Sequence, residues 1–269
     1  VNMAFVGASE GIFNISFTYF GYTFLNFPIV GFLGALIVIV LITILFGAKP
    51  QPQGKTSMQT GWSSAERRLM GIMLVALALW MTDSLHGISP AWIALAAALV
   101  CVTPGIGMLP ASVITNEVNY GAWLFVAGVI GVGAIANHSG LGGAMGELLL
   151  ANIPLTKDGG IVTFYEIFAI SAAVGVVTTF PAAPPIVTSF SDAIAQATGW
   201  PLESVLLVQV PSWMIYPFPH EAPPVAMAMA VGGVPMREAF RLTSVYFVIG
   251  ILIILPLQYL WGSMLGIYL

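Results

Sequence analysis

The 269-residue sequence has little charge: 7% of its residues are Asp, Glu, Lys or Arg, whereas 58% are hydrophobic. Soluble domains carry about a quarter of charged residues, so this composition excludes an ordinary soluble protein. It is typical of a chain that crosses a membrane several times, because charge is costly inside hydrocarbon. The sequence therefore predicts an all-α polytopic membrane protein.

Other features are also scarce. Cys101 is the single cysteine, so the chain has no internal disulfide. No basic run is present, which excludes a nucleic-acid-binding stretch. No spacing of His or carboxylate residues resembles a metal site, and no nucleophile stands in a catalytic setting. We therefore expect no metal site, no enzyme activity and no nucleic-acid partner.

The sequence lacks an initiator methionine and a signal-peptide pattern, since it opens on Val1 and leads directly toward the membrane. We expect it to be the C-terminal part of a longer protein. Residues 7–11, GASEG, precede an aromatic run over residues 13–27. This pattern predicts irregular backbone followed by an element at the membrane interface, where Tyr side chains are enriched.

Long apolar runs mark the membrane spans. Residues 28–46 are sufficient to cross about 30 Å of hydrocarbon at 1.5 Å per residue. The following loop, residues 47–68, holds four of the seven basic residues, which predicts a cytoplasmic location. Arg237 and Arg241 precede the last span, about residues 242–261, so counting spans places the C-terminus on the non-cytoplasmic side. Further spans are expected at residues 69–82, 90–103, 121–137 and 161–180.

Half of the 18 prolines lie between residues 180 and 229. A proline inside a helix removes a hydrogen-bond donor and clashes with the preceding turn. In hydrocarbon such a break is tolerated only where the backbone is buried in protein or lines a wet cavity. The two clusters, PAAPP at 181–185 and PFPHEAPP at 217–224, therefore predict two breaks that form one binding site near the bilayer midplane.

The segments around these clusters suggest how each break is built. The span at 161–180 is followed by a short, polar return segment, residues 186–199, which predicts a re-entrant hairpin over about residues 161–200. The second cluster interrupts a helix over about residues 204–232. A re-entrant hairpin beside a broken helix is an arrangement of secondary transporters.

The order of these parts resembles the second half of the divalent anion/sodium symporter family, which imports dicarboxylates, citrate or sulfate. The resemblance covers nearly the whole chain and rests on SAERRLMGIMLVALALWMTD, GAWLFVAGVIGVGAIANHSGLGG, the hairpin after TTF and the APP-centred break. It implies inverted repeats, with residues 1–46 ending the first and residues 69–269 forming the second. It also implies a location in the bacterial inner membrane and a homodimer.

In that family a Ser-Asn-Thr motif at the hairpin tip and a Thr-Pro-Pro-Asn motif at the break bind substrate and sodium. The resemblance places the substrate-binding positions at Pro181, Ala182, Ala183, Pro184, Ala222, Pro223, Pro224 and Val225. These side chains carry no hydrogen-bonding group, so backbone carbonyls freed at the break would supply some of the sodium ligands.

Ionisable residues are present at the breaks, where the family has neutral ligands. His220 and Glu221 interrupt an otherwise apolar region, and ionisable residues inside a membrane are functional candidates because they are costly to bury. Glu10 has a comparable place in the first repeat, so inverted repeats would bring Glu10 and Glu221 to one cavity from opposite sides. Paired carboxylates can carry protons. We expect these three residues to couple transport to a proton or a sodium ion, without another cofactor.

The sequence thus predicts an ion-coupled secondary transporter of small anions, such as dicarboxylates, citrate or sulfate. A cation/proton antiporter on a related fold is an alternative, favoured by Glu10 and Glu221 where the family has neutral ligands. A membrane enzyme or assembly subunit without transport is a further alternative. The expected partners are a small anionic substrate, a coupling cation, membrane lipid and a second copy of the chain.

Overall fold

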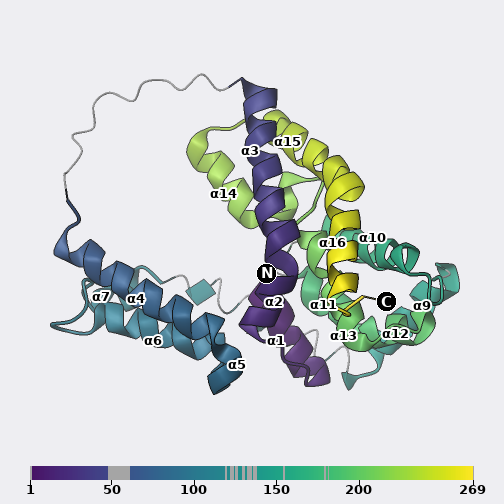
Figure 1. The fold of residues 1–269 in the computed structure, drawn as a ribbon, viewed down its shortest axis with the longest axis horizontal. Coiled ribbons are helices and arrows are strands. Elements are labelled where there is room, and N and C mark those ends of the chain that lie inside the picture. Colours follow the sequence, from purple (N-terminus) through teal and green to yellow (C-terminus); the bar gives the residue numbers. More distant parts are fainter. Residues whose placement is uncertain are drawn as a thin grey trace. The chain divides into compact units, whose positions relative to one another are not determined.

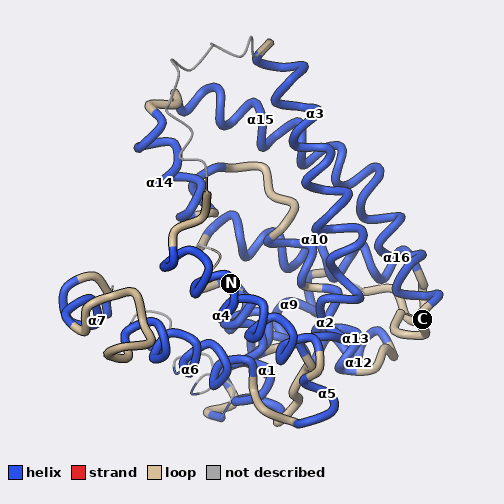
Figure 2. Tube along the Cα trace, turned by 60° about the vertical axis from the view of Figure 1, so that its left-hand side comes forward, coloured by secondary structure: helices blue, strands red, loops and turns tan. Residues whose placement is uncertain are grey.

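A computed structural model describes residues 2–47, 61–118, 120–121, 138–153, 155–178, 180 and 182–268, with isolated positions 124, 127, 128, 131 and 135. The described part consists of helices and connecting segments, without a strand, which confirms the predicted all-α class (Figure 2). It forms two compact units. One comprises Val1–Ser16, Leu25–Ala48 and Trp123–Leu269, and the other Phe17–Phe24 and Lys49–Ala122.

Two described helices are long and apolar enough to cross a membrane. The first, Tyr19–Phe46, is made of α2 (Tyr19–Asn26), the π-helix η1 (Phe27–Leu33) and α3 (Gly34–Phe46). The second, Met236–Met264, is made of α15 (Met236–Ile249), the π-helix η4 (Gly250–Ile254) and α16 (Leu255–Met264). They contain the predicted spans at 28–46 and 242–261. Two shorter apolar helices are α6 (Pro90–Val102) and α10 (Ile161–Val177).

From Leu25 onward the first long helix belongs to the larger unit, where it lies beside the second long helix and runs in the opposite direction (Figure 1). Gln258 Nε2 donates to the carbonyl of Leu25 at 3.2 Å. Farther along, Gly34 lies so close to Tyr246 that a Cβ at residue 34 would be 2.7 Å from the Tyr246 hydroxyl. As the residue number rises along one helix, the number of the facing residue falls along the other. The two helices are therefore antiparallel.

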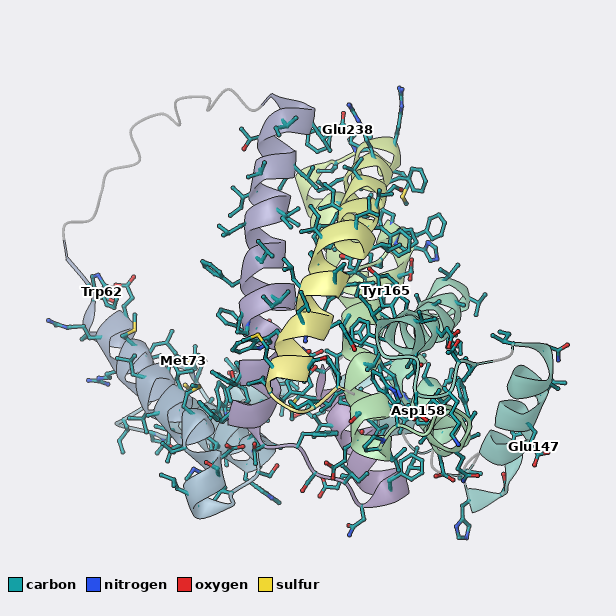
Figure 3. The ribbon with its side chains drawn as sticks, turned by 45° about the vertical axis from the view of Figure 1, so that its right-hand side comes forward. Trp62, Met73, Glu147, Asp158, Tyr165 and Glu238 are labelled. Carbon is teal, nitrogen blue, oxygen red and sulfur yellow. The ribbon has the colours of Figure 1, made fainter. Side chains whose placement is uncertain are left out.

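The second long helix contains a carbonyl that its own backbone leaves without a donor. The N–H of Leu255 donates to Gly250, as in a π-helix, and Pro256 has no N–H to offer Ile251. The Tyr165 hydroxyl of α10 donates to the Ile251 carbonyl at 2.5 Å (Figure 3). This bond joins α10 to the second long helix at its most irregular point.

The remaining helices of the larger unit are short. They are α1 (Asn2–Phe13), α9 (Leu141–Asn152), α11 (Ala183–Ser189), α12 (Ser191–Thr198), α13 (Leu202–Val208), the 3₁₀-helices η2 (Val210–Trp213) and η3 (Pro219–Glu221), and α14 (Pro223–Gly232). Helix α11 packs against α10 and α1. Phe5, Ala8 and Ser9 of α1 are buried. Residues 7–11 are therefore helical and not irregular as predicted, because packing against α11 stabilises the helix.

The smaller unit contains α4 (Ser64–Met81), α5 (Asp83–His86), α6 and α7 (Ser112–Asn116). Helix α4 begins with a capping box: Glu66 accepts from the Ser63 N–H at 2.7 Å, and the Glu66 N–H donates to the Ser63 hydroxyl at 3.2 Å. Helix α4 packs against α6. Buried Asp83 accepts from the backbone N–H of Tyr19, which caps the start of the first long helix.

Three predicted features fall on residues outside the described part. These are most of the loop at 47–68, most of the glycine-rich span at 121–137, and Pro181 at the expected hairpin tip.

Candidate functional site

The chain loses regular helical structure between Met214 and Ala222. Helix η2 ends at Trp213, η3 is a single 3₁₀ turn, and Ala222 is extended (φ −109°, ψ 94°) before α14 begins. The prolines explain this course, because they remove donors and restrict the backbone on both sides of η3. At the first positions of α14, in contrast, prolines suit the helix start.

The backbone carbonyls of this break have protein donors. The Pro217 carbonyl accepts from the hydroxyls of Thr243 at 2.7 Å and Ser244 at 3.3 Å, both on α15. Backbone N–H groups donate to the carbonyls of Phe218, Pro219, Glu221 and Ala222. The break is thus a hydrogen-bonded structure held by α15, in which these five carbonyls, of Pro217, Phe218, Pro219, Glu221 and Ala222, accept protein donors.

Glu221 is the buried ionisable residue of the break, with 1% of its surface exposed. Its Oε1 accepts from the Phe218 N–H at 3.1 Å. Its Oε2 lies against Gly175 of α10, where a Cβ would stand 3.3 Å from that oxygen. The absence of a side chain at residue 175 therefore leaves the space that the carboxylate fills.

The same residue joins the break to the turn after α10. The Phe180 N–H donates to the Glu221 carbonyl at 3.0 Å. The Phe180 ring also meets Tyr216 edge to face at 4.7 Å between centroids. The structure thus brings together the two proline-rich segments that the sequence singled out. The contact is made by Phe180, Tyr216 and Glu221 rather than by the residues at the family motif positions.

His220 lies in different surroundings from its neighbour. Its side chain is exposed, and its Nε2 lies 3.4 Å from the Val176 carbonyl at the end of α10. Its ring stands 5.6 Å from that of Phe218, which in turn stacks on Phe240 of α15 at 5.7 Å. His220 therefore lies at the outer side of the site, whereas Glu221 lies inside it.

The other predicted site residues divide between buried and exposed positions. Ala183 (2% exposed) and Pro184 are buried at the start of α11, Ala182 is half-buried beside them, and Ala222 is 5% exposed. Val225 is half-buried and Pro224 exposed in the first turn of α14, and the Pro223 side chain lies outside the described part. Glu10 has an exposed side chain on α1. Burial thus distinguishes Glu221 from the other two predicted coupling residues.

A second buried polar cluster lies beside α11 and was not predicted. Gln209 Nε2 donates to the Ser191 hydroxyl at 2.6 Å, and the Ser212 hydroxyl donates to the Gln209 carbonyl at 2.7 Å. Within the described part, Gln209 Oε1 and Thr188 Oγ1 are buried oxygens without a hydrogen-bond partner. The described residues contain no group of three or more His, Cys, Asp or Glu that could hold a metal ion.

The sequence pattern also did not identify the residues that support the site. Gly175 stands in a run of small residues, AAVGVV, where close helix packing is the ordinary explanation of a glycine. Thr243 and Ser244 form a polar pair inside the last long helix, and this pair was the signal that could have indicated their role.

The helical fold, the two long apolar helices and the proline-rich break are typical of an integral membrane transport protein. A family model described as a citrate transporter, CitMHS, matches residues 1–232 of the 269. The chain therefore belongs to the citrate transporter family. No curated protein matches it significantly. Citrate is among the substrates that the resemblance to divalent anion/sodium symporters implies, whereas sodium symport stays a prediction.

Proposed function

We propose that this chain takes part in secondary transport of small carboxylate anions of the citrate kind, coupled to protons through Glu221. The observation that carries the proposal is the buried Glu221 carboxylate at the break. The Phe218 N–H donates to this carboxylate, and the missing side chain of Gly175 leaves room for it. A carboxylate buried in a membrane protein is costly, so its presence favours a functional role. The family description supports an anionic substrate over the antiporter and enzyme alternatives.

The hydrogen bonding of the break favours a proton over sodium at this place. Sodium would need oxygen ligands, but the carbonyls from Pro217 to Pro219 and those of Glu221 and Ala222 already accept protein donors. Ala182, Ala183 and Val225 add no side-chain oxygen. Glu221 is thus the buried group of the break that can take up and release a proton, whereas His220, the other ionisable group there, is exposed.

Protonation of Glu221 also supplies a link between charge and conformation. A protonated carboxyl carries a donor and is a weaker acceptor, so the bond from the Phe218 N–H is weakened. The carboxylate form stabilises the η3 turn, and the protonated form lets it shift relative to Phe180 and α15. Binding or release of the proton thus shifts the equilibrium between two arrangements of the break. Such a shift is what coupling requires.

The proposal is tested by replacing Glu221 with Gln, which keeps size and hydrogen bonding but removes the titration. In the protein reconstituted in liposomes, we expect Glu221→Gln to flatten the pH dependence of citrate transport while citrate exchange continues. Glu117→Gln, at an exposed carboxylate of the smaller unit, is the matched control and should leave the pH profile unchanged.

A second candidate is sodium coupling at the cluster beside α11, favoured by the buried oxygens of Gln209 and Thr188. Oxygens without a partner are the ligands that a sodium ion would need. An unchanged pH profile in Glu221→Gln, together with sodium-dependent transport, would remove Glu221 from the mechanism and favour this candidate.

A further inference from the structure

We infer that Arg237 and Arg241 form a binding site for an anionic carboxylate or phosphate group at the start of α15. A pocket of about 270 Å³ lies there, lined by Arg237, Glu238 and Arg241. This volume far exceeds the roughly 10–15 Å³ that a single water requires, so the pocket has room for a small organic anion.

The charges of the pocket suit an anion. Arg237 and Arg241 are one helical turn apart, and both side chains are exposed. No ion pair joins either of them to a carboxylate in the described part of the chain. Among the described residues, the lining consists of two guanidinium groups and the Glu238 carboxylate, which together carry a net charge of +1. Guanidinium groups bind carboxylate or phosphate through paired hydrogen bonds, whereas Glu238 limits the affinity.

Helix α15 connects this pocket to the break. Phe240, which lies between Arg237 and Arg241 in the sequence, stacks on Phe218, whose N–H donates to Glu221. One turn farther, Thr243 donates to the Pro217 carbonyl. The helix that carries the pocket thus also holds the segment of Glu221. An anion bound here would lie at the N-terminal end of α15, near the residues of this helix that contact the break.

Two sources could supply the anionic group. One is the substrate, whose carboxylates would bind before or after passing the break; this source rests on the proposed function. The other is an anionic phospholipid, because Met236 and Phe240 beside the arginines are 61% and 44% exposed and could contact acyl chains. Both sources present an oxyanion to the same guanidinium groups.

The test uses the protein in nanodiscs of phosphatidylcholine, with and without phosphatidylglycerol, and measures citrate affinity by calorimetry and bound lipid by native mass spectrometry. If citrate is the ligand, the double variant Arg237→Gln/Arg241→Gln should weaken citrate binding at least about tenfold, which is 1.4 kcal/mol. Glu238→Gln should strengthen it, and replacement of both arginines by Lys should give an intermediate loss.

If the ligand is lipid, citrate affinity stays unchanged and the double variant loses bound phosphatidylglycerol, which also supports the site. Arg67→Gln, at an exposed arginine in the first turn of α4, is the matched control for general loss of charge. The inference is overturned if the double variant changes neither citrate affinity nor bound lipid. Failure of the proposed function is distinguishable, since it would appear in the pH profile of Glu221→Gln and not in these affinities.

Discussion

Gly175 shows how a single small residue determines the position of a charged one. Its missing side chain leaves room for Glu221 Oε2, and a Cβ would lie 3.3 Å from that oxygen. Gly175→Ala should displace the carboxylate, because α10 and the break both contact it. We expect transport to fall several-fold and its pH midpoint to shift, with an overpacking cost of about 1–3 kcal/mol.

Liposome transport over a pH series would measure both effects. Gly11→Ala is the matched control, since Gly11 lies on helix α1 and a Cβ there would meet nothing within 4 Å. If Gly175→Ala transported with the pH profile of the unmodified protein, Gly175 would have no role in positioning Glu221.

At the residue scale the sequence indicated the important region but not the arrangement within it. His220 and Glu221 are neighbours with equal claims in the sequence, yet one side chain is exposed and the other is 1% exposed. Their difference arises from the η3 turn and from Gly175 on another helix. Such contacts between distant segments leave no local pattern, which is why Glu10 and Glu221 were predicted to be equivalent.

At the element scale the expected re-entrant hairpin over about residues 161–200 stays a prediction. The structure provides α10, the turn at Phe180 and Ala182, and the short helices α11 and α12. Ala183 is 2% exposed and Ala182 half-buried. In a Cys101→Ala background, cysteines at these two positions should react with a water-soluble maleimide much more slowly than one at Trp62, which is 58% exposed.

Rapid labelling of Ala182→Cys and Ala183→Cys, at the rate of the Trp62→Cys control, would show an ordinary surface loop. That result would exclude the hairpin. Slow labelling that citrate slows further would place the hairpin tip next to the substrate.

The sequence predicted a helix where a long apolar run forms one, and an interruption where prolines prevent one. The break at residues 214–222 follows from its prolines, and the start of α4 follows from the Ser63 and Glu66 capping box. The first long helix begins at Tyr19 instead of Pro28, because the π-helix η1 accommodates Pro28 near its start. Residues 7–11 are helical because tertiary packing against α11 outweighs the low helix propensity of glycine.

At the scale of the whole molecule the expected inverted repeats stay a prediction, whereas the topology of the two long helices follows from their antiparallel packing. Antiparallel spans place the end of the first, near Phe46, and the start of the second, near Met236, on the same membrane side. The basic residues predict that this side is the cytoplasm.

Cysteines replacing Trp62 and Val234 should therefore react with an impermeant reagent only from the cytoplasmic side, and one replacing Leu85, after α4, only from the other side. These residues are 58%, 41% and 84% exposed, so each is accessible to the reagent. Labelling of Trp62→Cys and Val234→Cys from opposite sides would contradict the expected topology.

The central claim is that a proton on Glu221 couples the break to transport. Its most direct test is the uptake of radiolabelled citrate by proteoliposomes over a pH series, with the unmodified protein and Glu221→Gln compared at equal reconstitution. The account predicts a pH-dependent rate for the unmodified protein and a flat profile for the variant, with citrate exchange preserved in both. Two superimposable, pH-dependent profiles would contradict it.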